Sequence, residues 1–518
     1  MNPPTDHSPF AAGNRQVLLE VALVFVVFFV QGATPVPDVN EPYYLGRAIR
    51  FWQPGWAAGD FFLCTDQSHR VFYFAFGWLS LWLSPTAMAW VGRLMTWLLM
   101  AWAWRRLSFA AVPRRWYSVL TAALLVAVIE HCHMAGEWLI GGVEAKGFAY
   151  VLVLLGLEAL LRNRWNRTWL LLGAAASFHV LVGGWAVVAA AIAWIATGAR
   201  DLRSMLPGLL GGLVLSLPGL LPSLLLNFGT EPDVIRQANM IYVFERLYHH
   251  LSISQIPGWF VARFLLLTLV WLVLCRVTPA DEVSRRLRAF VAGTLVIALV
   301  GVVLAPLAYF DQALCAAVLR FYWFRLIDVV VPLGTVLTAA SLIAWKLQSS
   351  PRLGRFALAA AIVAASVPLG LHAAERLVPR TPRADRLPNY VAWRRACNWV
   401  VDSRQIDLDA KFLTPRMTQT FKWYTKRPEV ANWKEIPQDA AAIVEWRLRM
   451  RDLYATGWRA PAERWHEWPG GSDFRRLKEI GDKYDADYVI TFVRPQLPLE
   501  VVYRNRTYVI YRLPATDP

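Results

Sequence analysis

Long apolar runs recur along residues 17–371, and short polar segments separate them. A helix needs about 20 predominantly apolar residues to cross the hydrocarbon core of a bilayer. We therefore expect an all-α, polytopic membrane domain with about eleven transmembrane helices. The expected crossings are Val17–Val30, Thr86–Trp104, Trp116–His133, Gly147–Leu161, Thr168–Val182, Trp185–Thr197, Ser204–Leu226, Trp259–Cys275, Phe290–Tyr309, Phe321–Trp345 and Phe356–Leu371.

The arginine clusters give these helices an orientation. They fall in alternate connections, for example at residues 162–167 and 285–288, whereas the other connections hold acidic residues and histidines. Connections rich in positive charge face the cytoplasm. This places residues 1–16 in the cytoplasm, with a first helix that is retained because no convincing cleavage site follows it. Residues 71–83 are expected to lie in or along the membrane, since a full crossing there would invert every later helix.

The character of the chain changes after residue 371. Three prolines mark residues 372–389 as a linker. Beyond it, strands alternate with amphipathic helices, which predicts a small α/β soluble domain over residues 390–518, outside the membrane. The expected helices are Tyr390–Val401, Met417–Tyr424, Ala440–Leu453 and Phe474–Tyr484, and the expected strands are Lys411–Thr414, Ala486–Phe492, Glu500–Tyr503 and Thr507–Leu513.

The composition supports a membrane protein and narrows its partners. Of 518 residues, 56% are hydrophobic and only 17% are charged. A net charge of +16 would favour nucleic acid in a soluble chain. Here the arginines follow the positive-inside pattern instead, so membrane lipid is an expected partner and nucleic acid is not. Five scattered cysteines without a CxxC motif predict neither a zinc site nor a disulfide framework.

An acidic loop, residues 33–70, directly follows the first apolar run. In it Asp38 and Glu41 stand three residues apart, so a helical turn would place both carboxylates on one face. Carboxylates at a membrane boundary are costly to desolvate and usually have a function. The alternative is a helix cap, in which Asp38 caps and Glu41 completes a capping box. Three further candidate substrate-binding residues of this loop are Tyr43, Tyr44 and Arg47.

The stretch Asp38-Val-Asn-Glu41-Pro-Tyr-Tyr resembles the acidic motif in the first external loop of the GT-C superfamily of polytopic glycosyltransferases. This superfamily includes oligosaccharyltransferase catalytic subunits and protein O-mannosyltransferases, and many bacterial members carry an extra soluble domain outside the membrane. Its members take a sugar from a polyprenyl phosphate or diphosphate carrier, and the acceptor attacks the anomeric carbon with inversion. The resemblance implies that Asp38 is the catalytic base and Glu41 its neighbour.

A second constellation lies at the expected outer end of the third crossing. Glu130, His133 and Glu137 have the spacing of one helix face, and Glu144 and Lys146 follow them. In the oligosaccharyltransferase branch, an acidic motif of the second external loop helps to hold a divalent metal. The resemblance thus implies a metal such as Mg²⁺ or Mn²⁺, with Glu144, His133 and Glu137 as candidate ligands. Histidines and carboxylates at this spacing also suit zinc, and interhelical hydrogen bonding is the alternative.

Three more features complete the candidates. His179 lies at an outward helix end, where a packing role competes with substrate binding. Residues 227–256 form a connection long enough for a lid or binding loop. Arg325 and Asp328 are spaced to pair with each other. Arg320 has no acidic partner nearby in sequence, so its guanidinium is free to bind a phosphate.

Together these features predict a hexosyltransferase of the cell membrane, which moves a sugar from a polyprenyl-phosphate carrier to a glycan, lipid or protein acceptor on the outer face. Its predicted substrate-binding residues are Tyr43, Tyr44, Arg47, Lys146, His179 and Arg320. The alternatives are a lipid or polysaccharide transporter and a non-catalytic GT-C-like protein. A transporter should show internal repeats and polar groups near the bilayer midplane. We find no repeat, and the polar groups gather at one face.

Overall fold

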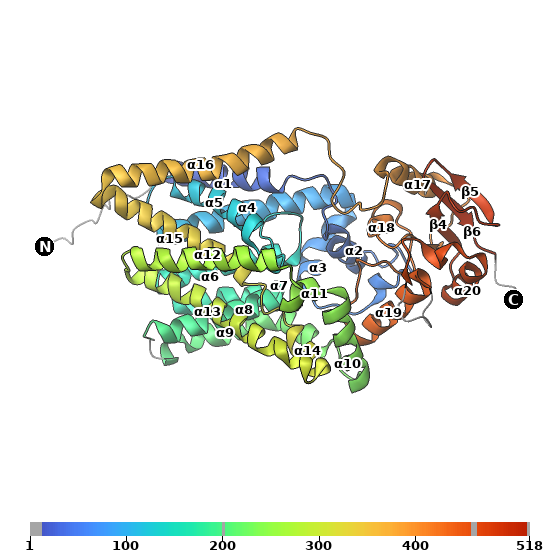
Figure 1. The fold of residues 1–518 in the computed structure, drawn as a ribbon, viewed down its shortest axis with the longest axis horizontal. Coiled ribbons are helices and arrows are strands. Elements are labelled where there is room, and N and C mark those ends of the chain that lie inside the picture. The colour runs from blue at the N-terminus through green and yellow to red at the C-terminus, as the bar shows by residue number, and fades with distance from the viewer. Residues whose placement is uncertain (1–12, 199–201, 457–463, 515–518) are drawn as a thin grey trace.

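The computed structural model describes residues 13–198, 202–456 and 464–514. A bundle of long helices forms most of the molecule, and a smaller C-terminal domain lies at one end of this bundle (Figure 1). The bundle contains α1 (Asn14–Gly32), α4 (Pro85–Ala111), α5 (Tyr117–Cys132), α6 (Ala145–Leu161), α7 (Trp165–Phe178), α8 (Val180–Ala196), α9 (Leu202–Leu225), α12 (Gly258–Val277), α13 (Glu282–Leu304), α15 (Ile327–Ser349) and α16 (Pro351–Arg376).

Six helical stretches of the described chain are long and apolar enough to cross a membrane: α1, α9, α12, residues 282–309, α15 and α16. Helices α5 and α8 are shorter and also apolar. Several of these helices expose large apolar side chains, such as Leu224 (68% exposed) and Val303 (67%), which suits contact with lipid. These apolar helices confirm the prediction of a multi-pass membrane protein. The number of eleven crossings stays a prediction.

The break between α7 and α8 differs from the expected one. The glycine pair at residues 183–184 suggested a turn there, but the helices break at His179. Gly183 lies inside α8, and a Cβ on it would come within 2.1 Å of the Ala176 backbone nitrogen. This glycine therefore permits close packing of α8 against α7 and does not make the turn.

Two further details of the outer connections are corrected. Helix α5 ends at Cys132, so Glu130, His133 and Glu137 do not share one helix face. The connection over residues 227–256 is helical: it contains α10 (Pro232–Met240), the π-helical turn η3 (Ile241–Arg246), α11 (Tyr248–Leu251) and the 3₁₀ turn η4 (Ile253–Gln255).

The first external loop, residues 33–70, is also largely ordered into short elements. They are α2 (Glu41–Trp52), the 3₁₀ turn η1 (Phe62–Cys64), and, just beyond the loop, α3 (Arg70–Gly77) and the 3₁₀ turn η2 (Trp78–Leu81). Helix α3 has 8 residues, and at 1.5 Å per residue it is about 12 Å long, less than half of a bilayer core. It is too short to cross, as expected for residues 71–83, and Trp82 beside it is 72% exposed.

The C-terminal domain is a four-stranded sheet between two pairs of helices. The strand order is β1 (Phe412–Leu413), β4 (Tyr488–Phe492), β6 (Tyr508–Arg512), β5 (Glu500–Arg504), with β1 parallel to β4 and the other pairs antiparallel. Helices α17 (Tyr390–Asp402) and α18 (Phe421–Thr425) pack with Ile490 and Ile510 on one face. Helices α19 (Ala440–Tyr454) and α20 (Phe474–Tyr484) pack with Val489 and Val509 on the other. The short pair β2 (Ala455–Thr456) and β3 (Arg464–Trp465) completes the strands.

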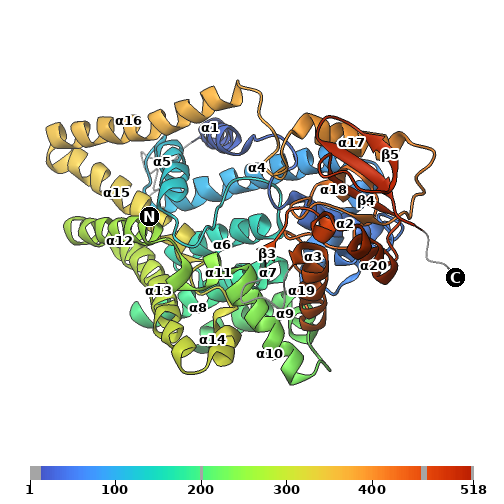
Figure 2. The ribbon, with the colours of Figure 1, turned by 45° about the vertical axis from the view of Figure 1, so that its right-hand side comes forward.

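Buried polar contacts join this domain to the first external loop. The ammonium of Lys422 in α18 lies 3.1 Å from Asp60 of the loop and 3.0 Å from Glu429, and these side chains are 1% exposed. It also pairs with Glu435. Helix α19 packs beside α10, as Figure 2 shows. The domain is therefore docked onto one end of the bundle by both charged and apolar contacts.

Candidate functional site

Glu41 is the first residue of α2 and is completely buried. Its carboxylate accepts two hydrogen bonds of 2.7 Å from Arg93 of α4. It also accepts the backbone N–H groups of Asp38 (2.7 Å) and Val143 (3.0 Å). All four of its acceptor positions are thus occupied. Glu41 links the first external loop, α4 and the connection before α6, and it does not face a cavity.

Asp38 holds the same connection from a second point. One carboxylate oxygen accepts the N–H of Val39 (2.8 Å) and the other accepts the N–H of Gly142 (3.1 Å), and Asp38 is 2% exposed. A Cβ on Gly142 would come within 2.8 Å of the Asp38 Cβ, so this close approach requires glycine. The predicted capping box is only half formed, because Glu41 caps the N–H of Asp38 while α2 begins at Glu41 itself.

Glu144 and Lys146 follow this fixed connection. Glu144 Oε1 accepts a hydrogen bond of 2.8 Å from Asn40 Nδ2, and Glu144 Oε2 lies 3.5 Å from Lys146 Nζ. The same ammonium lies 3.4 Å from Glu137 Oε1. Burial raises the pKa of Glu144, and the charge of Lys146 and the Asn40 hydrogen bond oppose that rise. The backbone anchored by Asp38 and Glu41 therefore presents two carboxylates to one lysine.

Arg325 extends this array of alternating charges. Its Nε lies 3.3 Å from Glu137 Oε2, and its Nη1 donates to His179 Nε2 over 3.0 Å. The predicted Arg325–Asp328 pair is wrong. Asp328 instead accepts three backbone N–H groups from residues 134, 135 and 137, and this fixes the irregular chain beyond α5. Arg325 consequently pairs with Glu137 and lines a cavity.

These charged groups line one cavity of about 720 Å³ between one end of the bundle and the C-terminal domain. Of the residues expected to act, seven line it: Tyr43, Tyr44, Glu137, Glu144, Lys146, His179 and Arg320. One wall is apolar and is formed by the end of α9, including Leu220 and Leu224. Leu224 is 68% exposed, so this wall continues onto the apolar surface of α9.

Four expected residues lie elsewhere. Asp38 and Glu41 form the supports described above. Arg47 is completely buried, donates to the Thr65 hydroxyl (2.8 Å) and lies 3.9 Å from the centre of the Phe62 ring. His133 Nδ1 lies 3.0 Å from the carbonyl oxygen of Ile129. The substrate-binding role of Arg47 and the catalytic roles of the two acids stay predictions.

The predicted metal ligands do not converge on one point. Over residues 13–198, 202–456 and 464–514, no group of three or more His, Cys, Asp or Glu side chains could hold a metal ion. Glu137 and Glu144 share the ammonium of Lys146. The ring of His133 instead lies 5.2 Å from the ring of Phe260. A divalent metal therefore stays a prediction, and no step below is routed through one.

Six further residues line the cavity. Arg246, His249 and His250 belong to the connection 227–256, which was expected to be a lid or binding loop, whereas His69, Arg386 and Lys434 were not singled out from the sequence. Burial, with Arg325 nearby, lowers the pKa of His69 to about 4, and burial with Arg246 lowers that of His249 to about 4. Both histidines are therefore neutral at pH 7. Arg386 could have been proposed from the sequence, because the linker that contains it is rich in arginine.

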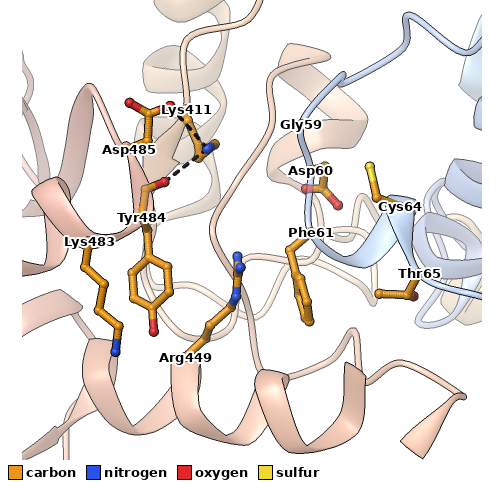
Figure 3. Close-up of a pocket in the computed structure, with 10 residues that line it drawn as sticks. All are labelled: Gly59, Asp60, Phe61, Cys64, Thr65, Lys411, Arg449, Lys483, Tyr484 and Asp485. Atoms are coloured by element: carbon orange, nitrogen blue, oxygen red, sulfur yellow. Dashed lines mark hydrogen bonds and ion pairs between the residues drawn. The ribbon is translucent and has the colours of Figure 1, made fainter. Parts of the chain in front are cut away.

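A second, more open pocket of about 390 Å³ lies between the first external loop and the C-terminal domain (Figure 3). Its cations already have partners. Lys411 Nζ donates to the Tyr484 carbonyl oxygen (3.0 Å), and Lys483 Nζ pairs with Asp452 (2.6 Å). Arg449 pairs with Glu445 and lies 4.1 Å from the centre of the Phe61 ring. This pocket belongs to the domain contact, and the larger cavity is the candidate site.

A family model described as a domain of unknown function (DUF6798) matches residues 391–453. No curated protein sequence matches the chain significantly. Among solved structures, the chain is similar to an oligosaccharyltransferase of Archaeoglobus fulgidus crystallised with zinc and sulfate, with 13% identity, a TM-score of 0.47 and coverage of 92% of this chain and 68% of that one. The oligosaccharyltransferase AglB from Archaeoglobus fulgidus, in complex with an inhibitory peptide and a dolichol-phosphate, gives the same identity and TM-score, with coverage of 92% of this chain and 69% of that one.

A third similar structure is apo ArnT from Cupriavidus metallidurans, with 14% identity, a TM-score of 0.37 and coverage of 96% of this chain and 97% of that one. Two of the three structures are of an oligosaccharyltransferase. At these identities the likeness concerns the course of the backbone. The function proposed below rests on the cavity.

Proposed function

We propose that this chain is an integral-membrane glycosyltransferase that moves a sugar from a polyprenyl-phosphate carrier to an acceptor on the outer face of the cell membrane. The observation that carries the proposal is a single cavity that combines an apolar, partly exposed wall at α9 with a strongly charged interior. A lipid-linked phosphate needs both surroundings at once. Its chain remains in the hydrocarbon phase while its anionic group requires cationic hydrogen-bond donors.

Arg320 is suited to the carrier phosphate. It lines the cavity beside Phe321, which is 48% exposed, and near the end of α9. Its Nη1 donates to Asn239 Oδ1, a neutral partner. Within the described residues Arg320 forms no ion pair, so its positive charge remains available. A guanidinium binds phosphate through two parallel hydrogen bonds, which fixes the orientation as well as the position of the ligand.

Glu144 is suited to act as the general base. The acceptor hydroxyl attacks the anomeric carbon of the sugar, the bond from that carbon to the carrier phosphate oxygen breaks, and the hydroxyl proton passes to Glu144. Asn40 fixes one oxygen of this carboxylate, and Lys146 stabilises its charge. The leaving phosphate keeps the bonding electron pair, and Lys146 stabilises its negative charge, while Arg320 binds and orients the phosphate. Attack from the face opposite the phosphate gives inversion.

The base predicted from the motif was Asp38. In the proposal Asp38 and Glu41 are positioning residues, since they fix the backbone of residues 142–143 from which Glu144 extends. Tyr43, Tyr44 and His179 line the cavity and provide surfaces for the sugar. The eleven crossings, a cytoplasmic N-terminus and an outer C-terminal domain belong to the same proposal. They are supported by the arginines in alternate connections.

A direct test is transfer from a radiolabelled polyprenyl-phosphate hexose by the purified full chain in liposomes. Glu144→Gln should lower the rate by about 10²–10⁴, the usual contribution of a positioned base. Glu130→Gln is the matched control, because Glu130 pairs with His372 away from the cavity, and it should retain transfer. Carrier binding without any turnover by the wild type would favour the non-catalytic alternative. Movement of the intact carrier across the bilayer would favour a transporter.

A further inference from the structure

The part of the cavity beneath the C-terminal domain contains cations from three separate segments. Arg246 comes from the helical connection between α9 and α12, Arg386 from the linker and Lys434 from the C-terminal domain. They are close enough for their charges to interact. Arg246 and Arg386 both lower the pKa of Lys434, and Arg386 lowers the pKa of Arg246. Three elements that are distant in sequence thus bring interacting positive charges to one cavity.

These cations differ from Lys146 and Arg325 in their partners. Lys146 and Arg325 each lie within 3.5 Å of a carboxylate. By contrast, none of Arg246, Arg386 and Lys434 forms an ion pair with any acid that the structure describes. Arg246 donates from Nε to the Trp433 carbonyl oxygen (2.9 Å) and from Nη2 to that of Lys434 (3.3 Å). Its charge thus holds the C-terminal domain in place and is not neutralised.

The backbone that carries Lys434 is held on several sides. Asn432 Oδ1 accepts the N–H groups of Lys434 (3.0 Å) and Glu435 (3.1 Å). Glu435 is tied to Lys422, and Gln438 accepts two hydrogen bonds from Ser68 of the first external loop. An ordered loop therefore presents the Lys434 side chain to the cavity, and the position of its ammonium does not depend on a flexible surface segment.

The positive charges around Lys434 change its pKa. Burial, together with Arg246 and Arg386, lowers the pKa of Lys434 to about 7, although Glu144 attracts its charge. Lys434 therefore loses its charge far more readily than an exposed lysine. An anion placed among the three cations would remove the repulsion and restore the full charge of Lys434. The arrangement is thus more favourable with an anion bound than without one.

We propose that Arg246, Arg386 and Lys434 form a second anion site, which binds a phosphate or carboxylate group in addition to the carrier phosphate at Arg320. The proposal deepens the proposed function and rests on it for the identity of the cavity. The group is either an anionic substituent of the acceptor or the second phosphate of a carrier diphosphate. In both cases the C-terminal domain contributes a substrate contact through Lys434.

Amine labelling of Lys434 tests the site directly. The full chain in detergent is treated with a trace of acetic anhydride at pH 7.5, and mass spectrometry compares the acetylation of Lys434 with that of exposed Lys426. We expect Lys434 to react many-fold faster than Lys426, because only the uncharged amine reacts. Pyrophosphate at millimolar concentration should slow Lys434 at least tenfold and leave Lys426 unchanged. Labelling of Lys434 that no concentration of phosphate or pyrophosphate alters would overturn the proposal.

Two linker arginines provide a matched pair of variants. Arg386 lines the cavity and Arg383 does not, and both are exposed. Arg386→Gln should weaken the protection by pyrophosphate at least fivefold. It should also slow labelling without ligand, because removing a neighbouring positive charge raises the pKa of Lys434. Arg383→Gln should behave as the wild type. Equal protection of Lys434 by pyrophosphate in the two variants would contradict the proposed anion site.

Two short carriers identify the source of the anion. Two results together would assign the site to the second carrier phosphate. Farnesyl diphosphate should protect Lys434 from acetylation, and inorganic phosphate should fail to protect it when farnesyl phosphate is saturating. If inorganic phosphate still protects under those conditions, the group belongs to the acceptor. The measurement needs no turnover. Protection without sugar transfer would overturn only the transferase function, and transfer with an unprotected Lys434 would overturn only the second anion site.

Discussion

Glu41 and Arg93 form a two-point ion pair that is completely buried, with Arg93 Nε and Nη2 each 2.7 Å from one carboxylate oxygen. The pair joins α2 to α4, and Glu41 also accepts the backbone N–H of Val143. It therefore fixes the distance between three segments that surround the cavity. The acidic pair of the motif thus has a clear structural role, and its catalytic contribution depends on what this support holds in place.

Removing one member of this pair should be costly. We expect Arg93→Met to lower the free energy of unfolding by about 3–5 kcal/mol, because Glu41 is left as an unpaired buried charge. Thermal unfolding in detergent measures the change. Arg285→Met is the control, since Arg285 and Glu282 are 61% and 62% exposed, and a surface pair contributes about 0–1 kcal/mol. Equal losses for the two variants would refute the structural role of the buried pair.

The buried cluster around Lys422 should make domain docking depend on pH. Burial raises the pKa of Glu435, and the negative charges of Glu429 and Asp60 add to this rise against the attraction of Lys422. A carboxyl whose pKa is raised in the folded state favours folding below its unfolded pKa, and this stabilisation is lost as the pH rises through the folded value. We therefore expect the contact to loosen between about pH 4.5 and neutral pH.

Hydrogen exchange of residues 418–438 at pH 5 and pH 8 measures this change. After division by the intrinsic exchange rate at each pH, protection should be higher at pH 5. In Glu435→Gln the difference between the two pH values should shrink, because the titrating group is gone. An unchanged difference in that variant would assign the pH dependence to another group.

Periodicity was sufficient to predict most of the elements. Helix α20 (Phe474–Tyr484) has the predicted bounds, and α19 differs from them by one residue at its end. These helices and the expected strands have local signals, because their apolar positions recur with the period of the element itself. Residues 133–144 lacked such a signal. Their path depends on the distant Asp328, whose carboxylate captures three of their N–H groups.

The candidate site was predictable in part for the same reason. Glu144, Lys146 and Arg320 stand out as charged residues at expected helix ends, and all three line the cavity. No sequence feature pointed to Lys434, because its position in the cavity depends on docking of the C-terminal domain through Arg246. Asp38 was recognised from a motif, which carries no information on whether a carboxylate faces a cavity or supports the backbone behind it.

Membrane topology can be measured at two exposed positions. Arg164 lies between α6 and α7, and Asp473 lies just before α20 in the C-terminal domain. In a background without native cysteines, Arg164→Cys and Asp473→Cys should react with an impermeant thiol reagent from opposite sides of sealed vesicles. The number of crossings between the two positions is odd in the proposed topology. Labelling from the same side would require an even number.

Arg320→Gln should weaken donor binding and leave the chemistry largely intact. The variant loses a charge-assisted, bidentate contact worth about 1.5–3 kcal/mol, so KM for the polyprenyl-phosphate sugar should rise roughly 10- to 150-fold at similar kcat. Arg236→Gln is the control, because Arg236 is 61% exposed and pairs with Asp233 on α10. A fall in kcat without a change in KM would place Arg320 at the transition state.

Asp38→Asn separates a supporting role from a catalytic one. Asn keeps one oxygen acceptor but offers an NH₂ group where Asp38 accepts a second backbone N–H, so one of the contacts to Val39 and Gly142 is lost. We expect kcat to fall by about 10²-fold, the effect of displacing a reacting group by about 1 Å, because Glu144 moves with this backbone. Glu144→Gln should fall at least as far, since it removes the base itself.

The pH profile of kcat tells the two roles apart. Transfer should rise with pH as Glu144 ionises, through a pKa that burial raises above the ordinary glutamate value. This rise should persist in Asp38→Asn and be lost in Glu144→Gln, with the residual rate then flat over the same range. If the rise disappears in Asp38→Asn and survives in Glu144→Gln, Asp38 is the base that its motif implies. Glu144 would then be the residue that only orients the acceptor.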